Sequence, residues 1–276
     1  MNIKFSDYDL SEFILRERDI AGKKCVLVFP PHIGSKWTKA TLMFRSSIWT
    51  EDGDLVSASY KKFHNWGEQP DLTYTPFSLT ANGGVQIMEK LDGSTLIVSK
   101  YKGEWVIRTR GTFDATELNN GHEITELKEK FKDLVEQYDS VQGGNYSFLF
   151  EWVTPENKIV LDYGEPDVYL TGIIDHADYS LLSQIELDVL GVEFGLKRPK
   201  TYSYPSIKAM VEDVPTWEGG EGVCVYCNKG QNIRKLKSEW YKTLHRMKSE
   251  LGSYERVVDF FFAADMPDYQ LFYQTI

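Results

Sequence analysis

The sequence lacks the features of secreted and membrane-spanning proteins. It has only three cysteines in 276 residues, an odd and small number that excludes a disulfide framework. No segment approaches the roughly 18 consecutive apolar residues of a membrane span. The first residues, Met1 to Asp7, lack the apolar run of a signal peptide. These absences predict a soluble, cytoplasmic protein without a membrane partner.

The sequence also lacks a recognisable metal-binding pattern. Cys224 and Cys227 form a single CxxC, whereas a structural zinc site needs four ligands. No second pair of cysteines exists, and the five histidines have no ligand spacing. We therefore interpret the two cysteines as positions in an apolar strand.

The glycine-rich signatures of common nucleotide-binding folds are absent as well. The sequence contains neither a GxxxxGK[ST] phosphate loop nor a GxGxxG fingerprint. It has no HExxH or GxSxG motif either. A nucleotide site in this chain would therefore lie between sheets and not at a glycine-rich strand-to-helix turn.

Acidic residues exceed basic ones, 41 to 31, for a net charge of −10. This balance argues against nonspecific coating of nucleic acid. One segment, from Arg234 to Lys248, is locally basic, with six Lys or Arg residues against Glu239. Charge alone leaves two interpretations open, a solvated helix face and a surface for a polyanion.

Short β-like runs dominate the sequence. Two pairs of them flank turn residues and predict hairpins, 95–99 with 105–109 and 146–153 with 159–163. Other expected strands are 25–29, 168–174 and 222–226.

Fewer segments have helical periodicity. Apolar residues recur at helical spacing over 124–138, and 181–192 predicts a second helix. Ser206 and Ser238 are expected to cap two more helices. The last of these would run to Leu251 with Trp240, Leu244, Met247 and Leu251 facing inward. Hairpins interspersed with irregularly spaced helices predict an α+β fold with antiparallel sheets.

The segment Glu89-Lys90-Leu91-Asp92-Gly93-Ser94 lies between two β-like runs. A lysine beside a turn glycine can reach a phosphate, or attack one as a neutral amine. Because a free lysine has a pKa of about 10.4, neighbouring cations would be needed to favour the neutral form. Taken alone, Lys-x-Asp-Gly is better interpreted as a surface hairpin turn.

The order of further motifs decides between these interpretations. From about Arg45 to about His245, the chain resembles the covalent nucleotidyltransferase superfamily and, within it, the phage RNA ligase 1 family. The resemblance implies a nucleotidyltransferase fold, with antiparallel sheets flanking a nucleotide pocket. Its six segments are Lys62–Glu68, Lys90–Ser94, Arg108–Gly111, Phe148–Trp152, Glu221–Val223 and Lys235–Lys237.

The resemblance also implies a role for each matching residue. Lys90 would carry AMP, while Lys235 and Lys237 would act with it in catalysis. Glu221 would hold a catalytic metal. At Arg110 the family often has lysine, so the hydrogen-bond geometry there would differ. The implied nucleotide-binding residues are Arg45, Glu89, Asp92, Gly93, Arg110, Glu151 and Glu221.

The implied activity is that of an ATP-dependent RNA ligase using ATP and Mg²⁺ (or Mn²⁺), which joins 5′-phosphate and 3′-hydroxyl RNA ends through lysyl-AMP. Its RNA partner would be single-stranded ends or broken tRNA, in the host cytoplasm if the protein is phage-encoded. We hypothesise that Lys242, Arg246 and Lys248 contact this RNA.

Three alternatives stay open: a DNA ligase, a capping-type guanylyltransferase, and a nucleotide-binding phage protein that has lost catalysis. The first two normally carry an OB-fold after the KxK segment, and too few residues follow Lys237 for one. We therefore expect a ligase domain over 1–250 and a short helical tail over 251–276.

Overall fold

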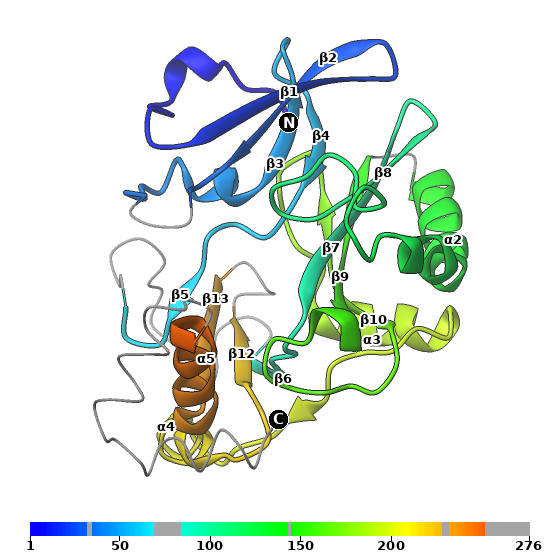
Figure 1. Cartoon of the computed structure of the whole chain (residues 1–276). Coiled ribbons are helices and arrows are strands. Elements are labelled where there is room, and N and C mark those ends of the chain that lie inside the picture. Colours follow the sequence, from blue (N-terminus) through cyan, green and yellow to red (C-terminus); the bar gives the residue numbers. More distant parts are fainter. Residues whose placement is uncertain (32–34, 69–83, 143–144, 228–231, 252–276) are drawn as a thin grey trace.

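The computed structural model describes residues 1–31, 35–68, 84–142, 145–227 and 232–251 (Figure 1). Within this part of the chain, three β-sheets are surrounded by helices α2 to α5. This confirms the predicted α+β class. Residues 252–276 lie outside the described residues, so the expected helical tail stays a prediction. None of the described helices is long and apolar enough to cross a membrane.

The first sheet contains four antiparallel strands in sequence order. Its β2 strand includes the predicted strand 25–29, whereas its other strands were not predicted. The first strand is exposed along nearly its whole length, so its sequence has little apolar pattern to reveal it. The strands are β1 (Ile14–Ile20), β2 (Lys23–Phe29), β3 (Ser47–Thr50) and β4 (Leu55–Ala58), with the 3-10 helices η1 (Phe5–Asp7) and η2 (Leu42–Arg45) beside them.

The second sheet is the central one and has the order β10-β9-β7-β8. The predicted hairpin around residues 102–104 is present, because β7 pairs antiparallel with β8. The predicted pairing of 146–153 with 159–163 is wrong, since β9 lies between β7 and β10 and residues 159–163 form no strand. The strands are β7 (Ser94–Tyr101), β8 (Glu104–Arg108), β9 (Tyr146–Val153) and β10 (Asp167–Asp175), and η3 (Pro155–Asn157) follows β9.

Two helices cover one side of the central sheet (Figure 1). Helix α2 (His122–Gln142) includes the predicted 124–138 helix and stacks Phe131 on Phe150 of β9, with 4.9 Å between ring centroids. Helix α3 (Gln184–Glu193) starts later than predicted because Ser183 forms a capping box with Glu186.

The third sheet has the order β11-β6-β12-β13-β5, antiparallel except for the parallel β13–β5 pair. Strands β6 and β7 follow each other in sequence but belong to different sheets. Lys90 to Gly93 therefore form a crossover between sheets and not a hairpin turn. The strands are β5 (His64–Asn65), β6 (Gln86–Glu89), β11 (Thr201–Tyr202), β12 (Gly222–Cys227) and β13 (Asn232–Lys237).

The predicted serine caps are confirmed. Ser206 accepts a hydrogen bond from Ala209 N at the start of α4 (Ile207–Asp213), which η4 (Val214–Thr216) follows. Ser238 accepts one from Tyr241 N at the start of α5 (Glu239–Leu251).

The inward residues of α5 differ in part from the prediction. Tyr241, Leu244 and Met247 are buried, whereas Trp240 is only partly buried. Cys224 and Cys227 lie in β12 as expected, and both thiols are free.

Candidate active site

A cavity of about 200 Å³, here called the Lys90 pocket, lies between the central and the five-stranded sheet. It joins residues from the β6–β7 crossover with residues of both sheets. Seven of the predicted site residues line this pocket. Glu221 is not among the lining residues but forms an ion pair with Lys90, which is. The lining residues are Arg45, Tyr60, Phe63, Glu89, Lys90, Leu91, Gly93, Thr95, Glu151, Thr171, Pro199, Cys224, Tyr226, Lys235 and Lys237.

One carboxylate oxygen in this pocket is shared by two ammonium groups. Lys90 Nζ and Lys237 Nζ each lie 2.8 Å from Glu221 Oε1. The Glu221 side chain is only 2% exposed. A carboxylate at that depth requires such partners, because an unpaired buried charge is strongly destabilising.

Backbone contacts fix the positions of these side chains. Lys90 N donates to Gly222 O at 2.8 Å, which ties the crossover to the start of β12. Gly222 has φ +137°, and a Cβ there would lie 2.1 Å from Leu236 O on β13. The glycine after Glu221 therefore allows β12 and β13 to approach closely where the carboxylate meets both lysines.

The two pocket lysines Lys90 and Lys235 have opposite electrostatic environments. Burial alone would lower the pKa of Lys90, but Glu221, aided by Glu151, outweighs it and raises that pKa above its ordinary value. Burial lowers the pKa of Lys235 to about 8, and the nearby charges of Arg45 and Lys90 add to this effect. Lys90 is thus held as an ammonium in the ligand-free protein, whereas Lys235 is close to titration.

Glu151 is held next to the crossover. Gly93 N donates to Glu151 Oε1 at 3.2 Å. Burial raises the pKa of Glu151 to about 7, and Glu221 adds to this rise while Lys90 opposes it. A Cβ on Gly93 would lie 2.4 Å from Trp152 O, so only glycine lets the crossover pack this closely on β9.

Asp92 is held by contacts within the protein, and its predicted nucleotide contact stays a prediction. It is 4% exposed, and its carboxylate is fully engaged by protein donors. Oδ2 accepts from Val160 N at 2.7 Å and Leu161 N at 2.8 Å, and Oδ1 accepts from Tyr241 OH at 2.5 Å. These bonds use the backbone donors of the segment that was expected to form a strand. Asp92 therefore fastens the Lys90 crossover to that segment and to α5.

Tyr241 and Tyr163 are site-supporting residues that the sequence analysis missed. Tyr163 OH accepts from Asp92 N at 2.9 Å, so both tyrosines hold the residue two positions after Lys90. The spacing of Tyr241 in α5, three residues from Leu244 and six from Met247, is the signal that places it on the buried face.

The cationic side of the pocket is built around Phe63. The Arg45 guanidinium lies 4.9 Å from the ring centroid and Lys235 Nζ lies 5.8 Å from it. Arg110 is exposed and does not line the Lys90 pocket. Its charge nevertheless contributes, after burial, to lowering the pKa of Arg45, which places Arg110 near the pocket rim.

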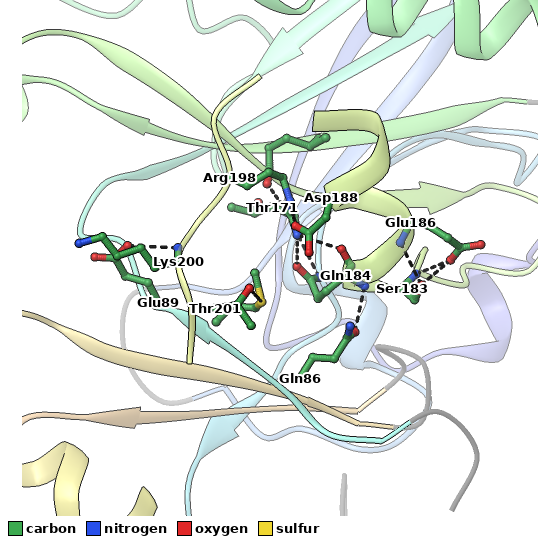
Figure 2. Close-up of polar contacts among 12 residues, drawn as sticks. Gln86, Glu89, Thr171, Ser183, Gln184, Glu186, Asp188, Arg198, Lys200 and Thr201 are labelled. Carbon is green, nitrogen blue, oxygen red and sulfur yellow. Dashed lines mark hydrogen bonds and ion pairs between the residues drawn. The ribbon is translucent and has the colours of Figure 1, made fainter. Parts of the chain in front are cut away.

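Glu89 anchors the strand that leads into Lys90. Its backbone N donates to Lys200 O at 2.7 Å, and its Oε2 accepts from Lys200 N at 3.3 Å (Figure 2). The start of the same strand is held by Gln86 Oε1, which accepts from Gln184 N at 3.1 Å. Arg198 in turn donates to Gln184 Oε1 at 2.7 Å and to Asp188 at 2.9 Å (Figure 2), a support that the sequence did not reveal.

The predicted basic stripe does not form one surface. Arg234 is buried in β13 and donates to Glu68 O, and Lys235 and Lys237 line the pocket. The three remaining cations are exposed on α5 and lie outside the pocket lining; they are Lys242, Arg246 and Lys248.

The acidic residues of the site fit a hard divalent cation. Glu89 and Glu151 line the pocket, and Glu221 reaches Lys90 from its wall. Carboxylate oxygens are the protein ligands that Mg²⁺ prefers, together with water and phosphate oxygens. Glu221 already neutralises two ammonium groups, so it could hold such an ion only after at least one of them leaves its carboxylate.

Comparison with known proteins supports the sequence resemblance. A family model described as RNA ligase matches residues 42–264. An RNA ligase of Rhodothermus phage RM378 is 29% identical over 177 residues, 53% of this chain and 40% of that protein. A second relative, from Thermovibrio ammonificans, is 24% identical over 81% of this chain. This chain spans 54% of its length. The chain thus spans about half or less of these relatives.

Solved structures show the fold. An archaeal ATP-dependent RNA ligase matches with a TM-score of 0.58 and 15% identity, over 96% of this chain and 73% of that one. A second form of an archaeal ATP-dependent RNA ligase matches with a TM-score of 0.57 and 17% identity, over 96% of this chain and 71% of that one. The predicted nucleotidyltransferase fold is therefore confirmed.

Proposed function

The chain belongs to the RNA ligase family, and on that premise we propose that it is an ATP-dependent RNA ligase whose Lys90 carries AMP. The observation that carries the proposal is the pairing of Lys90 with Glu221, which Lys237 shares, beside Glu151 and Lys235. A plain surface turn would not place a lysine beside the buried Glu221, the half-buried Glu151 and two further lysines.

The first step forms a bond between Lys90 Nζ and the α-phosphorus of ATP and breaks the bond to the leaving pyrophosphate. Nζ must lose its proton to attack, yet Glu221 holds Lys90 as an ammonium in the free protein. Activation therefore requires that Lys90 Nζ move off the Glu221 carboxylate and release its proton to solvent water before it attacks. Lys237 already lies on the same oxygen and keeps the carboxylate in place when Lys90 leaves it.

The surrounding cations suit the charge that develops on the phosphates. Lys235 and Lys237 lie two residues apart on β13 and both line the pocket. Arg45 lies on the same side, against Phe63. Fixed cations aimed at developing charge are among the strongest sources of catalysis.

The proposed cofactor is Mg²⁺ or Mn²⁺, held by Glu221 with help from Glu151 and Glu89. A bound divalent ion supplies further positive charge against the phosphate oxygens. In the same pocket, Glu151 is the residue proposed to bind the ribose hydroxyls, since Gly93 N holds one of its oxygens next to Lys90.

The later steps join two RNA ends. The 5′-phosphate of one end attacks the α-phosphorus and displaces Lys90, giving an adenylated end. A 3′-hydroxyl then attacks the RNA phosphorus and displaces AMP. We propose that Lys242, Arg246 and Lys248, exposed on α5, contact the RNA backbone. Replacing the three with Glu should weaken RNA binding and leave lysyl-AMP formation intact.

The decisive experiment uses ATP labelled on the α-phosphate with magnesium. The proposal predicts label on the denatured wild-type protein and none on Lys90→Ala. Lys100→Ala, a lysine on β7 outside the pocket lining, serves as the matched control and should label like wild type. Label from GTP alone would indicate a capping-type activity instead, and no label from a sample free of bound AMP would reject the proposal.

A further inference from the structure

A second cavity, here called the Phe63 cavity, adjoins the Lys90 pocket. Its volume is about 440 Å³, within the range of small-molecule sites. Phe63 lines both cavities and has Arg45 and Lys235 over its ring. A ligand that extends from the phosphate side of the Lys90 pocket past Phe63 would therefore enter this second space.

The walls of the Phe63 cavity are mainly apolar and aromatic. Met43 and Ile174 are buried core residues, and Leu181 packs against the same core. Tyr8 lies against Phe44 with ring centroids 5.1 Å apart, which holds its own ring in place. Aromatic and aliphatic walls of this kind suit the flat ring face of a nucleobase.

Tyr179 shows that one wall is held rigidly. Its φ of +63° lies in the left-handed region, which a tyrosine adopts only under constraint. Its hydroxyl donates to Ser59 O at 2.8 Å and Met43 O at 3.1 Å, so two separate segments fix the ring. Backbone strain that the surrounding contacts hold in place occurs often at ligand sites.

The charges of the cavity lining are predominantly positive. Lys39, Lys61 and Lys62 line it, against the single carboxylate of Asp178. Lys61 Nζ lies 5.2 Å from the Tyr179 ring centroid, directly over an aromatic wall. The chain as a whole has a net charge of −10, so these lysines form a local excess of positive charge. Such an excess favours the binding of a polyanion over that of a neutral metabolite.

We infer that the Phe63 cavity binds the first nucleoside of the RNA strand whose 5′-phosphate receives AMP, an inference that rests on the proposed function. The reacting phosphate must reach the Lys90 pocket, and the nucleoside attached to it lies one bond away. Phe63 lines both spaces, and Lys62 lines the Phe63 cavity next to it, where it would meet the backbone of the entering strand. Lys39 and Lys61 then face the next phosphates of the strand.

The test compares two RNAs of about ten nucleotides, both with a 5′-phosphate and a blocked 3′ end. One is intact and the other lacks the base of its first nucleotide. Wild type should bind the intact RNA about tenfold more tightly, because a stacked base is lost in the other. Leu181→Trp, which fills the cavity, should bind both RNAs equally. Equal binding of the two RNAs by wild type, or an unchanged preference in Leu181→Trp, would overturn the inference.

Charge reversal gives a second, independent readout. Lys39→Glu with Lys61→Glu should weaken binding of the intact RNA about tenfold. The control is Lys132→Glu with Lys208→Glu, on α2 and α4, which changes net charge equally away from the cavity. An equal loss in both double variants, or none in either, would contradict the inference.

Lysyl-AMP formation from ATP separates this inference from the proposed function. All of these variants should form lysyl-AMP as wild type does, which also shows that they are folded. If wild type forms no lysyl-AMP, the proposed function fails. If it forms lysyl-AMP but shows no preference for the intact RNA, only the assignment of the cavity fails.

Discussion

Lys90 and Arg108 are both largely shielded from solvent, and their surroundings are opposite. Lys90 faces Glu221 at 2.8 Å and opens into a pocket with further lysines. Arg108, on β8, is 0% exposed and has no carboxylate partner among the described residues. Its guanidinium donates to Ser57 Oγ at 2.9 Å and Ser46 Oγ at 2.5 Å, and to the carbonyls of both serines at 3.3 Å.

The Arg108 site is a closed structural network. Ser57 Oγ also accepts from Ser99 Oγ, which is linked to Ser147 and through it to His176. The bonds connect the first sheet with the central sheet through Ser57 of β4 and Ser99 of β7. Burial lowers the pKa of Arg108, and the neutral partners satisfy its hydrogen bonds without offsetting its charge.

The difference teaches how to tell a structural buried charge from a functional one. At Arg108 the donors of the guanidinium have protein acceptors, and the surrounding side chains are neutral. In the Lys90 pocket several charges of both signs share too few partners, and one carboxylate oxygen serves two lysines. Such unbalanced charge in a cavity is the arrangement that a charged ligand completes.

The largest expected effect comes from removing the shared carboxylate. Glu221→Gln should slow lysyl-AMP formation at least about 10³-fold, because Lys237 loses its anchor and the proposed metal loses its main ligand. The measurement is the rate of label transfer from α-labelled ATP. Glu218→Gln, exposed shortly before it in the chain, should react as wild type does. A Glu221→Gln rate within tenfold of that control would show that the shared carboxylate is not needed.

Arg108→Met should give the largest loss of stability. We expect the free energy of unfolding to fall by about 3 kcal/mol, since two buried carbonyl oxygens lose their donor. The measurement is urea unfolding, with Arg246→Met on the exposed face of α5 as the control. At temperatures where the variant stays folded, lysyl-AMP formation should be within a few-fold of wild type. Unchanged or greater stability would mean that the neutral network does not compensate for burying this charge.

Asp92→Asn separates the structural role of Asp92 from the predicted nucleotide contact. We expect a loss of about 2 kcal/mol in unfolding free energy, because an amide cannot accept all three hydrogen bonds. Tyr241→Phe, which removes one of the three donors, should cost about 1 kcal/mol and be non-additive with Asp92→Asn. A higher KM for ATP with unchanged stability would instead support the contact that the sequence predicted.

These cases show what the sequence could predict about the site. Lys90, Glu151, Glu221, Lys235 and Lys237 were assigned from ordered motifs, and the structure brings all five together. The sequence alone does not tell whether a carboxylate such as Asp92 faces a ligand or donors within the protein. The structure shows that Asp92 accepts hydrogen bonds from three protein donors.

The fold was predictable to a similar degree. Several strands with continuous apolar runs, such as β9, β10 and β12, and the amphipathic helix α2 were placed correctly, because burial leaves an apolar pattern in the sequence. The segment 159–163 has a strand-like composition, but two of its backbone N–H groups donate to Asp92 and not to a neighbouring strand. Because Asp92 lies far away in the sequence, this contact leaves no pattern in the residues of the segment itself. Strand β1 is exposed, so its pairing with β2 is not visible in its residue pattern either.

The smallest expected effect is a gain in stability. Glu151 has a pKa of about 7 in the folded protein, above its value of about 4.3 when unfolded. Between these values the folded state binds more protons, so stability falls as pH rises through this window. Glu151→Gln cannot ionise, and at pH 8 it should raise the unfolding free energy of the ligand-free protein by about 1 kcal/mol.

Near pH 4 that gain should be small, because the wild-type carboxyl is then mostly protonated in both states. Thermal unfolding at the two pH values measures the difference, with the exposed Glu165→Gln as the control that should show none. The same substitution should slow the reaction with ATP, because the proposed ribose contact loses its charge. A variant that is more stable and less active would show that the Lys90 pocket, unlike the Arg108 network, keeps its charges at the expense of stability.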